Sequence, residues 1–344
     1  MDQYKYVGNL FSEIVRPNGD IFSRNYEYLC AQARKAVFKI NRQLTNASPT
    51  PPALMLKLFN SSVKPILTFG SDIWGIYNTA HNTIDIFHRT FLKHILCVKS
   101  STCNSFVYGE TGELPISIDL SVFAIRYYHR LYNMPKGSLV KLAFDEMAVL
   151  SGLGFSTWVT KLQDVISKNN LDGYLSLPAK KFGILVKNKF RDEFLSGWSS
   201  SLTAPSARTY IRFNNEVKIA PFLYLVKIFK HRKSIAQLRC SSHRLSVETG
   251  RWSGIDLNRR LCPSCKVLDD EEHFVSHCRI NKKERATLHN FLFLSFFDRD
   301  IHDFQIFREN LFVNLMTSTN ECVLRAFGRF CYHSFNTRAI PLQD

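Results

Sequence analysis

Three cysteines and one histidine lie close together in the C-terminal third of the chain. Cys262, Cys265, His273 and Cys278 follow the pattern C-x2-C-x7-H-x4-C. Three thiolates and one imidazole complete the tetrahedral ligand set of a structural zinc ion and leave no position for a substrate. We therefore expect a structural Zn2+ site, and zinc binding in small sites of this kind contributes about 10–16 kcal/mol to folding.

The residues between these ligands indicate how they are positioned. Pro263–Ser264 predicts a tight turn between the first two thiols. A short helix after the acidic stretch Asp269–Glu272 would place His273 and Cys278 on one face. The neighbouring His277 is an alternative third ligand, and the sequence leaves that choice open. The alternative to a metal site is a chance cluster of buried cysteines and surface histidines.

Composition places the chain among folded, strongly basic proteins. It has 344 residues, 45% of them apolar, including 28 phenylalanines, which is enough for a substantial core in two or three modules. The formal net charge is +16 and the pI is about 9.5. Such an excess favours a polyanionic partner and salt-sensitive binding, although a merely basic protein is the alternative.

Cysteine usage and the N-terminus indicate the compartment. The total of nine cysteines is odd, and the six outside the zinc pattern show no disulfide framework, which fits a reducing compartment. The first residues lack a basic segment followed by an apolar run, so we expect no signal peptide. No apolar window is long enough to span a bilayer. We expect an intracellular protein, nuclear or cytoplasmic.

Hydrophobic periodicity predicts a mainly α fold with a short N-terminal β-hairpin. Tyr4 and Tyr6 alternate along a first strand, and Pro17-Asn18-Gly19 is a turn signal before a short return strand. Apolar residues recur at helical spacing from Tyr26 to Leu44 and along most of the chain beyond. The stretch 102–115 reads as a structured loop, and 282–338 as two or three helices.

Breaks in composition suggest four segments. They are a hairpin with the first helix (1–48), a thumb-like helical region (49–135), a helical linker (136–220), and a zinc-knuckle region with C-terminal helices (221–344).

An ordered series of motifs resembles the C-terminal part of a non-LTR (LINE-type) retrotransposon reverse transcriptase. The series runs from residue 4 to residue 278, and its order makes the resemblance specific. Its members are the strand Tyr4–Gly8 (with Val7 where leucine is usual), the thumb-like segments 57–75 (KLFNSSVKPILTFGSDIWG) and 99–109 (KSSTCNSFVYG), the segment 239–252 (RCSSHRLSVETGRW), and the knuckle 262–278.

The resemblance implies nucleic-acid binding without catalysis. Two-metal phosphoryl transfer needs an Asp pair on a strand hairpin and a third upstream Asp. The chain's only Asp-Asp pair, Asp269-Asp270, lies inside the zinc loop, where a solvated acidic loop is the expected structure. The fingers and catalytic palm of such a polymerase would precede the part matched here. We therefore expect no enzyme activity from this chain.

Basic clusters would supply the nucleic-acid contacts. In this family the thumb and C-terminal region hold the RNA template or RNA–DNA duplex, so cations would neutralise phosphates and exposed aromatics would stack on bases. Trp252 and Tyr210 are possible stacking residues, and Arg251 would either bind phosphate or pair with Glu248. The candidate cations are Lys180, Lys187, Arg191, Lys230, Arg232, Lys233, Arg251, Arg259, Arg260, Lys282, Lys283 and Arg285. The alternative function is a zinc-knuckle scaffold for a protein partner, with no nucleic-acid role.

Overall fold

The computed structural model of the chain is mainly helical, as the sequence predicts. It describes residues 3–6, 8–12, 21–44, 50–296 and 301–339. Within these ranges the strands are β1 (Gln3–Tyr6) and β2 (Asn9–Ser12). The α-helices are α1 (Ser23–Leu44), α2 (Pro52–Leu58), α3 (Lys64–Leu67), α4 (Ser71–Trp74), α5 (Asn78–Leu96), α6 (Asn104–Thr111), α7 (Ile116–Tyr132), α8 (Leu139–Gly152), α9 (Trp158–Lys168), α10 (Ala179–Ser201), α11 (Phe222–Leu225), α12 (Phe229–Arg239), α13 (Ser246–Trp252), α14 (Lys282–Phe296), α15 (Ile301–Glu309), α16 (Leu311–Thr317) and α17 (Glu321–Ala339). Short π-helical and 3-10 segments are η1 (Phe59–Val63), η2 (Asp172–Tyr174), η3 (Pro205–Ala207), η4 (Tyr210–Arg212), η5 (Leu257–Arg259) and η6 (His273–His277).

The chain forms two compact units, each built from separate stretches. Unit 1 comprises Met1–Asn46, Leu56–Arg89 and Leu114–Gly197, and unit 2 comprises Ala47–Met55, Thr90–Glu113 and Trp198–Asp344. Both units draw on more than one of the four segments expected from the sequence. None of the helices in the described ranges is long and apolar enough to cross a membrane.

The N-terminal hairpin is present, but it is shorter than predicted, because both of its strands lie within residues 3–12. β1 and β2 pair antiparallel with Tyr4 opposite Phe11, so the chain reverses at Gly8. Gly8 has φ +86°, a backbone conformation that glycine adopts without strain. The predicted turn at 17–19 lies outside the described residues. The hairpin is tied to α1 because Leu10 donates its backbone N–H to the buried Asn25 carboxamide at 2.9 Å.

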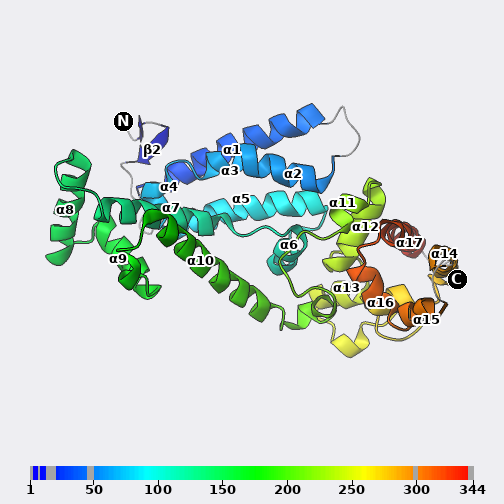
Figure 1. Cartoon of the computed structure of the whole chain (residues 1–344). Coiled ribbons are helices and arrows are strands. Elements are labelled where there is room, and N and C mark those ends of the chain that lie inside the picture. Colours follow the sequence, from blue (N-terminus) through cyan, green and yellow to red (C-terminus); the bar gives the residue numbers. More distant parts are fainter. Residues whose placement is uncertain (1–2, 7, 13–20, 45–49, 297–300, 340–344) are drawn as a thin grey trace. The chain divides into compact units, whose positions relative to one another are not determined.

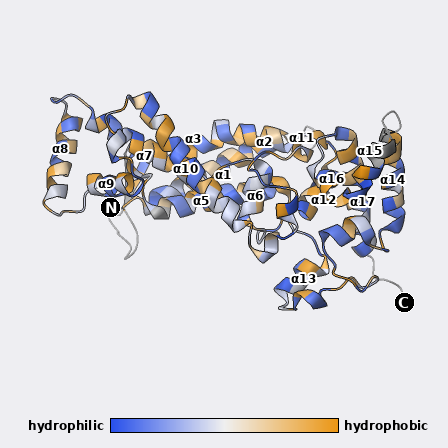
Figure 2. Cartoon of the chain, turned by 60° about the horizontal axis from the view of Figure 1, so that its bottom comes forward, coloured by the Kyte–Doolittle hydropathy of each residue, from blue (hydrophilic) through white to orange (hydrophobic). Residues whose placement is uncertain are grey.

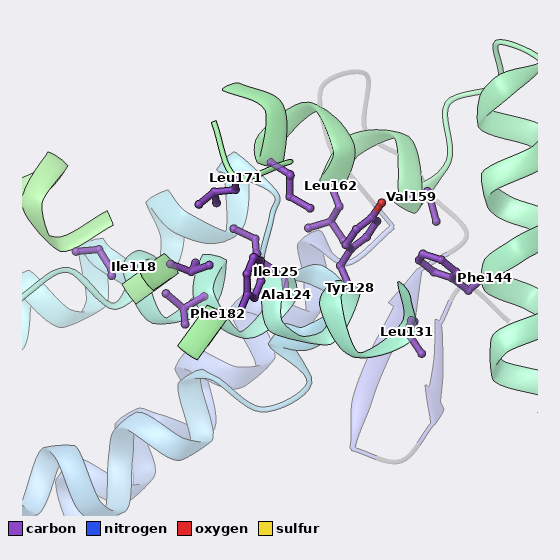
Figure 3. Close-up of a cluster of buried hydrophobic side chains, with 13 residues drawn as sticks. Ile118, Ala124, Ile125, Tyr128, Leu131, Phe144, Val159, Leu162, Leu171 and Phe182 are labelled. Atoms are coloured by element: carbon purple, nitrogen blue, oxygen red, sulfur yellow. The ribbon is translucent and has the colours of Figure 1, made fainter. Parts of the chain in front are cut away.

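The core of unit 1 is built around α7. Ala124, Ile125 and Tyr128 on this helix are buried against Val159 and Leu162 of α9, and Figure 3 shows Phe144 of α8 and Phe182 of α10 completing the cluster. The Tyr128 and Phe144 rings meet edge to face, with centroids 5.4 Å apart. This apolar cluster fixes the start of α10, which carries one of the basic groups predicted from the sequence.

Helix α8 presents an apolar surface to solvent. Only part of the helix packs on the core, through Phe144, whereas the side chains of Leu139 and Leu153 are 84% and 70% exposed. Leu142, Val149 and Phe155 are exposed on or just after the same helix. Figure 2 shows that α8 carries both hydrophobic and hydrophilic residues. Exposed apolar side chains that gather on one helix are a feature of interaction surfaces.

In unit 2 the helices α12, α14 and α17 pack together, with α12 beside α17 as Figure 1 shows. The predicted loop at 102–115 is instead largely the buried helix α6. Glycine has a packing role there, because a Cβ atom on Gly109 would lie 2.4 Å from the Tyr210 hydroxyl and 3.0 Å from the Trp198 ring. The C-terminal stretch contains four described helices, α14 to α17, rather than the two or three expected.

A buried ion pair joins α6 to α12. The Glu110 carboxylate is 0% exposed and accepts two hydrogen bonds from Arg239, at 2.7 and 2.9 Å. The Arg239 guanidinium also donates to the Met316 carbonyl and lies over the rings of Phe213 and Phe222. Because breaking such a buried pair leaves one charge uncompensated, it costs about 3–5 kcal/mol.

Gly109→Ala is expected to destabilise the protein, because the added methyl group meets buried aromatic side chains that have no space to move into. Overpacking of this kind costs about 1–3 kcal/mol, more than the gain of up to about 1 kcal/mol from replacing a helical glycine. Gly197→Ala is the matched control, since that glycine also lies in a helix and its added Cβ would have no atom within 4 Å.

Urea unfolding measures both variants. The control should be neutral or slightly more stable than the parent protein. If Gly109→Ala were as stable as Gly197→Ala, the close packing around α6 would be contradicted.

Candidate metal centre and basic surface

The four predicted ligands come together in unit 2. One ligand atom from each of Cys262, Cys265, His273 and Cys278 lies within 4.8 Å of all the others. The Sγ atoms of Cys262 and Cys278 are 3.9 Å apart. A tetrahedral ion with zinc–sulfur bonds of about 2.3 Å requires sulfur–sulfur distances of roughly 3.8 Å. The cluster therefore has the dimensions of a metal site such as a zinc site.

The first two thiols sit on a tight reverse turn. Cys262 donates its N–H to the Val267 carbonyl at 2.7 Å and accepts from the Lys266 N–H at 3.0 Å. Lys266 adopts φ +58°, and Leu261 bridges Leu268 across the turn. The short turn expected between the first two thiols is present. The left-handed residue that completes the reversal is Lys266, two positions after the predicted Pro263–Ser264.

The other two ligands are brought together by a π-helix, η6. The Cys278 N–H donates to the His273 carbonyl at 2.8 Å, an i to i+5 hydrogen bond. An α-helix would turn residues five apart away from each other, whereas the wider π-helix returns the fifth residue to the same side. The predicted short helix is correct in position and wrong in type.

The structure favours His273 over His277 as the fourth ligand. His277 is exposed and does not belong to the cluster. His273 is 7% exposed, and its Nε2 atom has no hydrogen-bond partner among the described residues. A buried imidazole nitrogen without such a partner, beside three thiols, fits a metal ligand. Burial lowers the pKa of His273, which favours the neutral ring that binds metals.

The acidic stretch Asp269–Glu272 is not the solvated loop that the sequence suggested. Asp269 and Glu271 are each 2% exposed. Asp270 accepts the His273 N–H at 2.8 Å, which caps η6, and Glu272 accepts from Arg212 at 3.0 Å. All four carboxylates therefore hold the cluster's polypeptide in place.

Glu271 is the centre of this anchoring network. Its carboxylate accepts hydrogen bonds from Thr209 at 3.0 Å, Ser241 at 2.9 Å and His243 at 3.0 Å, and Arg208 lies 3.6 Å away. The Leu245 N–H donates to the other His243 nitrogen, so His243 presents its Nε2–H to Glu271. Burial alone would raise the pKa of Glu271, but these bonds and charges lower it to about 2.

Arg338 of α17 joins the cluster from a distant part of the sequence. It donates to Cys278 Sγ at 2.7 Å and to Asp269 at 2.7 Å, and its Nη2 is 3.8 Å from Cys262 Sγ. Three thiolates around a divalent ion would carry a net charge of −1, which this guanidinium would offset. Sequence reasoning missed Arg338 because no local pattern marks an arginine 60 residues from its partner.

The predicted basic residues fall into two groups, those with exposed side chains and those bonded to neighbouring groups of the protein. Lys230, Lys233, Arg259, Lys282 and Lys283 are exposed in unit 2, and Lys180, Lys187 and Arg191 are exposed on α10 in unit 1. The other four serve local structure. Arg232 is 6% exposed and donates to the Val226 carbonyl, Arg260 to the Ile255 and Val247 carbonyls, Arg285 to the Cys278 carbonyl, and Arg251 to Glu248 at 2.6 Å.

The two aromatic candidates for base stacking, Tyr210 and Trp252, differ in their exposure to solvent. Tyr210 is fully buried, where its ring stacks on Phe106 at 4.3 Å, so it belongs to the core. Trp252 is 64% exposed, and the Arg251 guanidinium lies 5.2 Å from its ring centroid. Trp252 is therefore available for stacking, while Arg251 is engaged by both Glu248 and this ring.

Comparisons of the chain with protein-family models, with curated proteins and with solved structures found no match. The geometry of the site therefore carries the functional argument.

His273→Ala should reduce metal retention strongly, whereas His277→Ala should leave it unchanged, because only His273 belongs to the cluster. The direct measurement is the metal content of protein purified with added Zn2+, together with the visible spectrum of the Co2+-substituted protein. We expect one metal ion per chain in the parent and in His277→Ala. Equal metal content in the two variants would contradict the assigned ligand set.

Proposed function

We propose that this chain binds nucleic acid without catalysing a reaction, holding an RNA template or an RNA–DNA duplex. The proposal includes Zn2+ at Cys262, Cys265, His273 and Cys278 as a structural ion. It also includes kinship with the C-terminal region of non-LTR retrotransposon reverse transcriptases, on the motifs described above, and an intracellular location. The observation that carries the proposal is the placement of exposed cations on both sides of a rigidly anchored metal loop.

The metal loop supplies the rigidity that phosphate contacts need. Arg259 precedes Cys262, and Lys282 and Lys283 follow Cys278 at the start of α14. The backbone between them is fixed by the ligand turn, by η6 and by the buried carboxylates of Asp269 and Glu271. Cations on a rigid surface lose less freedom on binding than cations on a mobile loop, which favours affinity.

The charges themselves set the expected mode of binding. Exposed lysine and arginine side chains neutralise phosphates and release condensed counterions, so affinity falls steeply as salt increases. The formal charge of +16 supports such binding. Phosphate contacts of this kind position a protein on nucleic acid without reading its sequence, so we propose binding with little sequence preference.

Zinc in this site would hold the loop rather than take part in chemistry, because its four ligands come from the protein. Within this arrangement Arg338 offsets the thiolate charge and ties the loop to α17, and Asp270 caps the π-helix that presents His273 and Cys278.

A second candidate function is a scaffold for a protein partner. The exposed apolar side chains of α8, including Leu139, Leu142 and Leu153, favour it, because surfaces of this kind commonly mark protein interfaces. In that case, reversing the charges of Lys282 and Lys283 would leave binding of the partner intact.

Replacing Lys282 and Lys283 together by glutamine should weaken RNA–DNA hybrid binding and reduce its salt dependence. Each lost phosphate contact lowers the slope of log K against log salt by about 0.9, so the slope should fall by up to about 1.8. The measurement is fluorescence anisotropy of a labelled hybrid at several salt concentrations, with metal-loaded protein.

The matched control replaces Lys136 and Lys168, two exposed lysines of unit 1, by glutamine. It removes the same charge and should leave the slope nearly unchanged. Failure of the metal-loaded parent protein to bind RNA or the hybrid at low salt would show the proposed function to be wrong.

A further inference from the structure

Unit 2 contains a pocket of about 750 Å3 beside the metal loop. It is bounded by residues 97–99, by α12, by the segment 242–246, and by the end of α17. Pro263 and Asp269 of the metal loop also line it. The volume falls within the range of about 300–1,000 Å3 that is typical of small-molecule sites. We call this cavity the basic pocket.

Its charge is strongly positive. Lys99, Lys233, Arg244 and Arg338 line it, and Asp269 is the acidic residue among its lining side chains. Arg338 is already bonded to Asp269 and Cys278, so these charges largely cancel each other. Three cations remain on the wall, and Lys233 and Arg244 are exposed. The pocket is therefore suited to an anionic ligand.

Apolar side chains also line the basic pocket. Leu245, Ile280 and Phe335 line it, and the Phe335 ring stacks on Phe274 with centroids 4.7 Å apart. Apolar and cationic side chains that line one cavity suit a ligand with one planar apolar face and one charged group. A nucleotide has both parts, because its base offers a π-face to apolar side chains and its phosphate binds cations.

The pocket is also pre-organised. The Lys99 backbone N–H donates to Ser242 Oγ at 2.8 Å, and Lys99 Nζ donates to the His243 carbonyl at 3.1 Å. His243 is in turn bonded to Glu271, the buried anchor of the metal loop. The same network that fixes the loop therefore fixes one wall of the pocket, and little ordering is needed when a ligand binds.

We propose that the basic pocket receives one unpaired nucleotide of a bound nucleic acid, with its phosphate on Lys233, Arg244 and Lys99 and its base against Ile280 and Phe335. This inference rests on the proposed function and deepens it. A base-paired duplex is too wide for such a cavity, whereas a single-stranded nucleotide can turn its base out of the stack and enter. The pocket would therefore favour a duplex that carries a single-stranded extension.

The test compares two RNA–DNA hybrids in anisotropy titrations of the metal-loaded full chain, one blunt and one with a two-nucleotide single-stranded extension. The extended hybrid should bind about tenfold more tightly, in line with the contribution of one stacked base. Lys233→Gln combined with Arg244→Gln should reduce the ratio of the two affinities from about tenfold to nearly one, whatever the change in binding of the blunt hybrid. Both side chains are exposed, so the variant should fold, and circular dichroism checks this.

The matched control is the Lys282→Gln and Lys283→Gln variant, which should weaken both hybrids and retain the tenfold preference. Comparing the affinities of extensions with and without a terminal phosphate shows which phosphate is bound. Tighter binding of the extension with a terminal phosphate would indicate the terminal group, and equal binding would indicate an internal phosphate. Equal affinity for blunt and extended hybrids, or a preference that survives in the pocket variant, would overturn the assignment while leaving the proposed function standing. Absence of binding to either hybrid would instead overturn the proposed function.

A glutamate-rich peptide serves as a competitor. If it displaced the blunt hybrid and the extended hybrid equally well from the parent protein, and failed to do so from the pocket variant, the pocket would be a site for acidic peptides and the nucleotide assignment would be wrong.

Discussion

The buried carboxylate of Glu271 is the interaction on which the metal loop depends. A charge that is 2% exposed is tolerated only where hydrogen bonds and opposite charges replace its water. Thr209, Ser241, His243 and Arg208 supply them from separate parts of unit 2. Glu271 lies two residues before His273, so satisfying this charge also fixes the start of η6 and the position of a metal ligand. Removing one member of such a buried network typically costs about 3–5 kcal/mol.

Two consequences follow for the surface around the loop. Asp269 and Glu271 are buried against their partners, and the exposed residues around the ligands include the cations Arg259, Lys266, Arg279, Lys282 and Lys283. The same network also holds one side of the basic pocket in place, because His243 is hydrogen-bonded to both Glu271 and Lys99. Burial thus separates an inner anchor, formed by the carboxylates of Asp269 and Glu271, from the exposed cations around the metal loop.

The sequence predicted the parts of the site that depend on local spacing. The C-x2-C-x7-H-x4-C pattern predicted which four side chains come together, because residue type and separation nearly determine a closed cluster of this kind. Local patterns failed where long-range packing decides. They did not reveal that Asp269 and Glu271 are buried, that Arg338 reaches Cys278, or that a glycine-containing stretch forms the buried helix α6. An arginine in a basic cluster also gives the same sequence pattern in two different environments. Arg259 is exposed, whereas Arg232 is buried and donates to backbone carbonyls.

The most direct test of the account measures the affinity of an RNA–DNA hybrid for one protein preparation in three states: metal-loaded, stripped by a chelator, and reloaded with Zn2+. The account predicts that affinity falls on removal of the metal, because three thiolates and the loop that orders the flanking cations lose their common anchor, and that it recovers on reloading. Hybrid affinity that is the same in all three states would contradict the claim that a metal-ordered loop presents the nucleic-acid-binding surface.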